Sequence, residues 1–193
     1  MSALNSYSAR QKICSGGGRN MLEIGMICAE AGEKIARVSA NMAMAADMEV
    51  RASSTATTGA YSSACQRGLP AILMERGGGG RFTDSEVQAY KQDVKNIMIR
   101  MGLLSGEEVH TVQQKNVTRA EYLEAETDGL WYPVFSAGDT FAGGAVLGTV
   151  RDIWGNLLRE YRADYPGIIL YQTVGLGVKT GDPLIAYGEY VDR

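Results

Sequence analysis

The spacing of apolar residues changes partway along the chain, and this change limits the folds that the sequence can adopt. Up to about residue 104, short apolar runs suited to strands alternate with helical segments. The clearest helix covers residues 83–101, where Thr83 and Glu86 form a capping box and Gly102 ends the pattern. From Arg119 onward, short β runs separated by glycine recur at about ten-residue spacing. We therefore predict an α/β domain followed by a β-rich domain.

The polar segment 105–118 has no clear period and is the expected linker between the two domains. We place the first domain at residues 1–107 and the second at residues 119–193. The first should contain a mixed sheet covered by helices, and the second should be a small all-β barrel or sandwich. The apolar face expected of the helix over 83–101 consists of Val87, Tyr90, Val94, Ile97, Met98 and Met101.

Composition argues against several classes of function. The 193 residues include 19 Lys and Arg against 22 Asp and Glu, so we expect no electrostatic attraction to nucleic acid. No apolar run reaches the roughly 18 residues of a membrane span and no signal peptide is visible, so we expect a soluble, cytoplasmic protein without membrane contact. Three cysteines without CxxC spacing argue against a disulfide framework, and the single histidine, His110, excludes metal sites built from several histidines of this chain.

Glu75 is the first candidate for chemistry. It ends the apolar run Pro70–Glu75 just before four glycines, and strand ends beside glycine-rich turns are where open α/β sheets place catalytic groups. A carboxylate that emerges there from a buried face would have a raised pKa, in the range useful for a general base. The alternative, which the pattern slightly favours, is a structural Glu75 that forms an ion pair with Arg76 or Arg81.

The loop Cys14–Gly18, into which a short predicted strand ending at Cys14 runs, is a second candidate. Its backbone amides could hold an anion, or the Cys14 thiolate could bind a metal ion. A buried, unreactive cysteine beside a turn is the simpler alternative. The other glycine-rich loop, Gly77–Gly80, lacks the lysine and hydroxyl of a phosphate-binding loop, so it does not predict nucleotide binding.

Several segments together resemble the succinylglutamate desuccinylase/aspartoacylase family. They are GLPAILMERGGGGR at 68–81, the helix end at 101–104, LGTVRDIWG at 147–155 and VKTGDPLI at 178–185, and they span most of the chain in order. Members of this family are zinc-dependent hydrolases of N-acyl amino acids, with a carboxypeptidase-like α/β domain and a C-terminal β domain. The resemblance implies that Glu75 is the catalytic carboxylate, which takes a proton from a zinc-bound water and delivers it to the leaving amine.

The chain departs from the family pattern in its zinc ligands. The family binds zinc through an HxxE pair and a further histidine that stands before a Ser-Gly-Gly sequence. Cys14 occupies the position of that histidine here, no HxxE pair precedes it, and His110 matches no ligand position. By resemblance we assign Cys14 as a Zn²⁺ ligand, and we assign substrate contacts to Ser15, Gly16, Gly17 and Arg81.

Three explanations of the missing zinc motif stay open. We rank first a fragment or one half of a split deacylase, whose α/β sheet would be N-terminally incomplete. A non-catalytic module that binds a small molecule or a protein is second, and an autonomous hydrolase with an unconventional zinc site is third. Missing strands would leave an unpaired sheet edge, so we also expect a complementing chain or a homo-oligomer.

Overall fold

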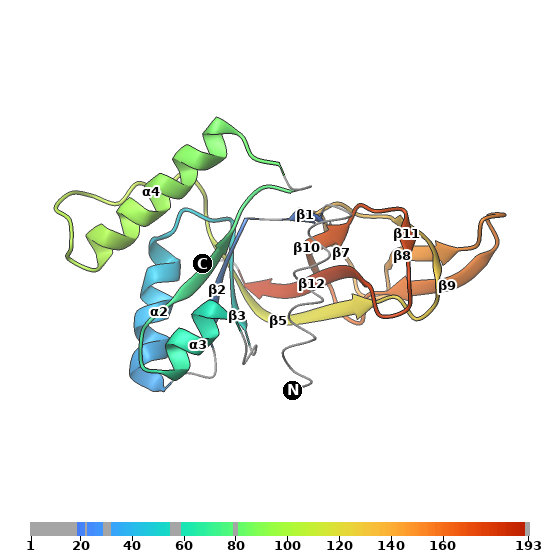
Figure 1. Cartoon of the computed structure of the whole chain (residues 1–193), viewed down its shortest axis with the longest axis horizontal. Coiled ribbons are helices and arrows are strands. Elements are labelled where there is room, and N and C mark those ends of the chain that lie inside the picture. Colours follow the sequence, from blue (N-terminus) through green and yellow to red (C-terminus); the bar gives the residue numbers. More distant parts are fainter. Residues whose placement is uncertain (1–18, 22, 29–31, 55–58, 79–80, 192–193) are drawn as a thin grey trace.

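A computed structural model of the chain describes residues 19–21, 23–28, 32–54, 59–78 and 81–191. Within these residues, three helices gather at one end of a long mixed sheet, and a β-rich part extends from the other end (Figure 1). The predicted sites at Cys14, Ser15, Gly16 and Gly17 lie outside the described residues. Within the described ranges, no helix is long and apolar enough to cross a bilayer.

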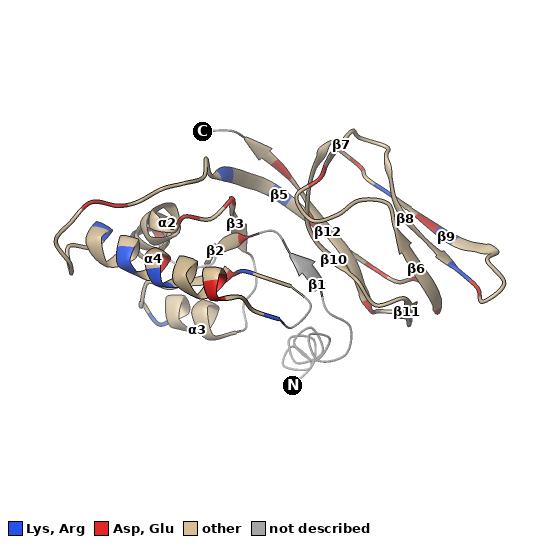
Figure 2. Cartoon of the chain, turned by 90° about the horizontal axis from the view of Figure 1, so that it is seen from above, with Lys and Arg blue, Asp and Glu red and all other residues tan. Residues whose placement is uncertain are grey.

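The helical part combines three strands with three helices. Its strands are β2 (Ile24–Cys28), β3 (Val50–Ser54) and β4 (Ile72–Glu75), and its helices are α2 (Glu33–Ala45), α3 (Ala60–Gln66) and α4 (Asp84–Arg100). Strands β2 and β3 are parallel, because α2 carries the chain back between them, whereas β4 pairs antiparallel with β2. Seen from above, the helices lie on one side of β2 and β3 and the β-rich part lies on the other (Figure 2).

Helix α4 begins as the sequence predicts, but it buries different residues. The Thr83 hydroxyl accepts the backbone N–H of Glu86, and the Glu86 carboxylate accepts the N–H of Thr83, which completes the capping box. The buried residues of α4 are Asp93 and Asn96, whereas Val94 is 48% exposed. The apolar face predicted for this helix is therefore only partly buried, because polar partners elsewhere in the fold bring Asp93 and Asn96 inward.

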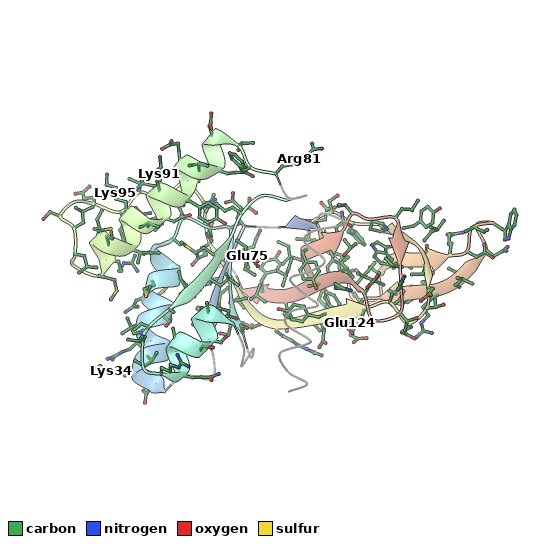
Figure 3. All side chains as sticks on the ribbon, viewed as in Figure 1. Lys34, Glu75, Arg81, Lys91, Lys95 and Glu124 are labelled. Carbon is green, nitrogen blue, oxygen red and sulfur yellow. The ribbon has the colours of Figure 1, made fainter. Side chains whose placement is uncertain are left out.

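The large sheet continues into the β-rich part without interruption. Its strand order is β1-β10-β12-β5-β3-β2-β4, with β7 also paired to β10; the added strands are β1 (Arg19–Met21), β5 (Lys115–Glu124), β7 (Thr140–Phe141), β10 (Gly167–Thr173) and β12 (Pro183–Val191). Strand β5 pairs parallel with β3 and antiparallel with β12, and it reaches from the helical part to Glu124 in the β-rich part (Figure 3). Four of the C-terminal strands (β5, β7, β10 and β12) thus belong to the mixed sheet, and a separate closed barrel is not confirmed.

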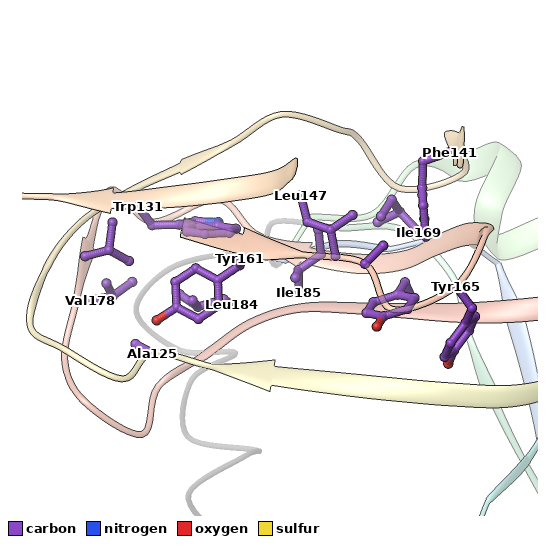
Figure 4. Close-up of a cluster of buried hydrophobic side chains, with 13 residues drawn as sticks. Ala125, Trp131, Phe141, Leu147, Tyr161, Tyr165, Ile169, Val178, Leu184 and Ile185 are labelled. Atoms are coloured by element: carbon purple, nitrogen blue, oxygen red, sulfur yellow. The ribbon is translucent and has the colours of Figure 1, made fainter. Parts of the chain in front are cut away.

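A second, antiparallel sheet covers these strands. It contains β6 (Gly129–Pro133), β8 (Val146–Arg151), β9 (Leu157–Arg162) and β11 (Gly177–Val178) in the order β11-β6-β8-β9. The main core lies between the two sheets, where Trp131, Leu147 and Tyr161 face Ile169 and Ile185 (Figure 4). This face-to-face packing is that of a sandwich. The mixed α/β sheet and the β-rich C-terminal half agree with the sequence prediction, and N-terminal incompleteness of the sheet stays a prediction.

Candidate functional site

Glu75 is the last residue of β4, and its side chain is half-buried (Figure 3). Its Cα partner across the sheet is Ile24, the first residue of β2. Because β4 runs antiparallel to β2, Glu75 lies at the end of the sheet where the parallel strands begin. The sequence argument had assumed the opposite end, where the carboxyl ends of the parallel strands lie. All four residues of β4 are half-buried, so the expected burial of this strand on both faces is incomplete.

Glu75 and Arg76 belong to opposite faces of the sheet, because successive strand residues alternate. Met74 is paired with Gly25, and a Cβ atom on Gly25 would lie 3.8 Å from a side chain of α2. Met74 and Arg76 are therefore on the face that α2 covers. Glu75 shares the other face with Ile24, whose side chain packs in an apolar cluster with residues of β3, β5, β10 and β12.

The Arg76 guanidinium is held by several acceptors on the face that α2 covers. It donates to both oxygens of Asp93 at 2.8–3.0 Å, to the Glu23 carboxylate and, at 2.7 Å, to the backbone carbonyl of Asp47. The Arg76 side chain is 3% exposed and Asp93 is fully buried. Burial alone would lower the pKa of Arg76, but hydrogen bonds to Glu23 and Asp93 outweigh it and raise the pKa. The ion-pair partners of Arg76 are therefore the carboxylates of Glu23 and Asp93.

The phenol of Tyr90 on α4 contacts the backbone on both sides of Glu75. It accepts the Arg76 N–H at 2.8 Å and donates to the Met74 carbonyl at 3.3 Å. Burial raises the pKa of Tyr90, and the nearby Glu75 carboxylate raises it further. The sequence analysis placed Tyr90 in the apolar face of the helix and did not identify Asp93 as a partner of Arg76. The available signal for a shared role was the three-residue spacing of Tyr90 and Asp93 on a helix that follows Arg76 in the chain.

The remaining predicted residues are placed away from this cluster. Arg81 is exposed, its backbone N–H donates to the Gly78 carbonyl at 3.2 Å, and its side chain lies apart from Glu75 (Figure 3). Its substrate-binding role stays a prediction. His110 lies 3.0 Å from a Glu108 oxygen and 4.0 Å from an Asp47 oxygen, beyond the end of α4.

The described residues supply no donor set for zinc. Among them, no group of three or more His, Cys, Asp or Glu side chains is arranged to hold a metal ion. Cys14, the ligand assigned by resemblance, lies outside the described residues. The zinc prediction therefore has no support from the described residues.

A cavity of about 490 Å³ opens at the same end of the sheet as Glu75, where the parallel strands begin. It lies between the starts of β3, β5 and β10, and its walls include Val50, Lys115, Gly138 and Ile168. Val50 is the Cα partner of Ile24, which is in turn the partner of Glu75. Two strand spacings, roughly 10 Å, therefore separate the backbone of Glu75 from this wall. Val50 and Ile24 share one apolar cluster, so Val50 belongs to the same sheet face as Glu75, although Glu75 itself does not line the cavity.

Comparisons with known proteins identify the fold. No family model and no curated protein matches the sequence. Solved structures do match: a product-bound ectoine utilization protein from Ruegeria pomeroyi (TM-score 0.77, 19% identity, 90% of this chain and 55% of that one), a succinylglutamate desuccinylase from Silicibacter sp. TM1040 (0.77, 20%, 91% and 56%) and a succinylglutamate desuccinylase/aspartoacylase from Rhodobacter sphaeroides (0.77, 20%, 92% and 56%). The chain spans about 55% of the length of these proteins. Over that span, it has the fold of the succinylglutamate desuccinylase/aspartoacylase proteins, as the sequence resemblance implied.

Proposed function

We propose that this chain provides the general-base carboxylate and part of the substrate site of a deacylase, which hydrolyses an N-acyl amino acid or a related small amide. The observation that carries the proposal is the position of Glu75, half-buried at the end of β4 on the same face and edge as the 490 Å³ cavity. The shared fold with proteins described as desuccinylases and aspartoacylases supports the same reaction class.

In the proposed reaction, the Glu75 carboxylate accepts a proton from a water molecule that attacks the acyl carbonyl carbon. The carbon–nitrogen bond then breaks, and the protonated Glu75 delivers the proton to the leaving amine. The products are a carboxylic acid and the free amino acid, so atoms and charge balance. The resemblance implies Zn²⁺ as well, but no step here depends on it because the described residues offer no ligand set.

A second chain or another copy of this one is part of the proposal. The chain spans about 55% of the length of the matching structures, and in this proposal a complementing chain or a second copy contributes further groups to the site. The alternative is a binding module that takes the same ligand without turnover. The cavity between the starts of β3, β5 and β10 would serve such a module equally well.

The test compares the wild type with Glu75→Gln on N-succinylglutamate and N-acetylaspartate, with and without added zinc. We expect turnover by the wild type and a loss of about 10²-fold or more in kcat for Glu75→Gln, because the amide cannot accept the proton. The matched control is Glu160→Gln on β9, far from the cavity, which should keep full activity. An active Glu75→Gln enzyme would exclude Glu75 as the base.

Zinc content separates the alternatives when no turnover is found. About one zinc per chain after purification without chelator would support a metal site that includes residues such as Cys14. No zinc and no turnover, together with saturable binding of the same amides, would favour the binding module. No binding either would exclude both functions for the isolated chain.

A further inference from the structure

The Tyr90 hydroxyl bridges the two peptide groups that flank Glu75. The Met74 carbonyl belongs to the peptide group before Glu75, and the Arg76 N–H belongs to the peptide group after it. One oxygen contacts both, at 3.3 and 2.8 Å. The φ and ψ angles of Glu75 are the only soft torsions between these two planar groups, so the bridge restricts both at once.

This part of β4 needs such support from outside the sheet. Glu75 is the last residue of a four-residue strand, and its register with β2 ends at Ile24, the first residue of that strand. The chain then enters a glycine-rich loop, in which Gly77 has φ +79°. Glycine permits many backbone conformations, so the strand end by itself would not hold one orientation of Glu75.

Tyr90 is well placed to hold the strand end because it is itself fixed. The Arg76 guanidinium lies 5.8 Å from the centre of its ring and binds Asp93, which is one turn further along α4. Burial raises the pKa of the phenol, so the hydroxyl keeps the proton that it donates to the Met74 carbonyl. Asp93 and Tyr90 thus fasten the segment 74–76 to one helix at three points.

We infer that Tyr90 is a positioning residue that sets the direction of the Glu75 carboxylate through the backbone, without contacting substrate. The inference rests on the proposed function of Glu75 as a general base. It predicts that removal of the Tyr90 hydroxyl alone, with Arg76 and Asp93 intact, lowers kcat and leaves KM nearly unchanged.

The test uses Tyr90→Phe in the full chain and, as its matched control, Tyr161→Phe. The Tyr161 hydroxyl also accepts a backbone N–H at 2.8 Å, that of Glu126, but it lies in the β-rich part. Amide hydrogen exchange measured by NMR should become at least tenfold faster at Arg76 in Tyr90→Phe and should be unchanged at Arg76 in Tyr161→Phe. In deacylase assays, kcat should fall at least tenfold in Tyr90→Phe with KM within twofold, and Tyr161→Phe should match the wild type.

The exchange measurement does not require activity, so it separates this inference from the proposed function. If the isolated wild-type chain has no turnover, the proposed reaction is not supported for this chain alone, and the exchange rate at Arg76 still decides whether Tyr90 holds the strand end. Exchange at Arg76 that stays within twofold of the wild type in Tyr90→Phe would overturn the inference. An unchanged kcat in Tyr90→Phe, together with faster exchange at the Arg76 amide, would also overturn the inference. Should Tyr90→Phe fail to fold, a rapidly exchanging Arg76 amide in the wild type would overturn the inference, and a protected one would support it.

Discussion

Replacement of Asp93 by alanine should strongly destabilise the fold, because it leaves the charge of Arg76 buried. Asp93 is fully buried and accepts two donors of Arg76 as well as the Asp47 N–H at 2.8 Å. After its removal, the 3%-exposed guanidinium keeps one carboxylate partner, Glu23. Loss of one partner from a buried ion pair costs about 3–5 kcal/mol. Since domains of this size are stable by roughly 5–15 kcal/mol, we expect a large fall in the unfolding midpoint.

Urea denaturation followed by circular dichroism measures this free energy of unfolding. The matched control is Glu126→Ala, which removes a pair with Arg159 in which both side chains are more than half exposed; it should cost about 0–1 kcal/mol. The double substitution Arg76→Met with Asp93→Leu removes both charges, and we expect it to recover about half of the loss. A cost below about 1 kcal/mol for Asp93→Ala would refute the assignment of Arg76 and Asp93 as a buried ion pair.

Three further predictions concern the core and the pH dependence. Gly148→Ala places a Cβ atom 2.2 Å from the ring of Trp131, so denaturation should show a loss of about 1–3 kcal/mol; an unchanged protein would mean that the ring moves freely. Leu147→Ala empties a fully buried position and should cost about 2–5 kcal/mol, and a smaller loss would indicate collapse of the cavity. Burial raises the pKa of Asp47, but hydrogen bonds from Thr111 outweigh it and the net pKa is lowered. The stabilisation by Asp47 is therefore present above the unfolded-state pKa and is lost as the pH falls through the folded-state pKa. Asp47→Asn should thus be less stable than the wild type at about pH 7, and the difference should shrink below about pH 4; a constant difference would contradict this reasoning.

Local sequence patterns predicted the elements well where their causes lie within a few residues. The capping box of Thr83 and Glu86 marks the start of α4, and the apolar run before Glu75 marks β4. The resemblance of several segments, among them GLPAILMERGGGGR at 68–81, also implied the deacylase-like fold that the matching structures share. The apolar face of α4 was less well predicted, because periodicity cannot show that Asp93 has a buried partner.

The sequence by itself indicated most of the segments that become strands and helices, and that Glu75 ends a strand beside a glycine-rich loop. The tertiary structure decided how those segments combine. Lys115 lies in the segment expected to be a linker, yet it begins the strand that joins β3 and carries one sheet through both halves. The partners Arg76 and Asp93 are 17 positions apart. Such pairings depend on which segments meet in space, whereas propensity and periodicity reflect only residues within one or two helical turns. Only the folded structure could therefore show that the Tyr90 hydroxyl contacts the backbone next to Glu75.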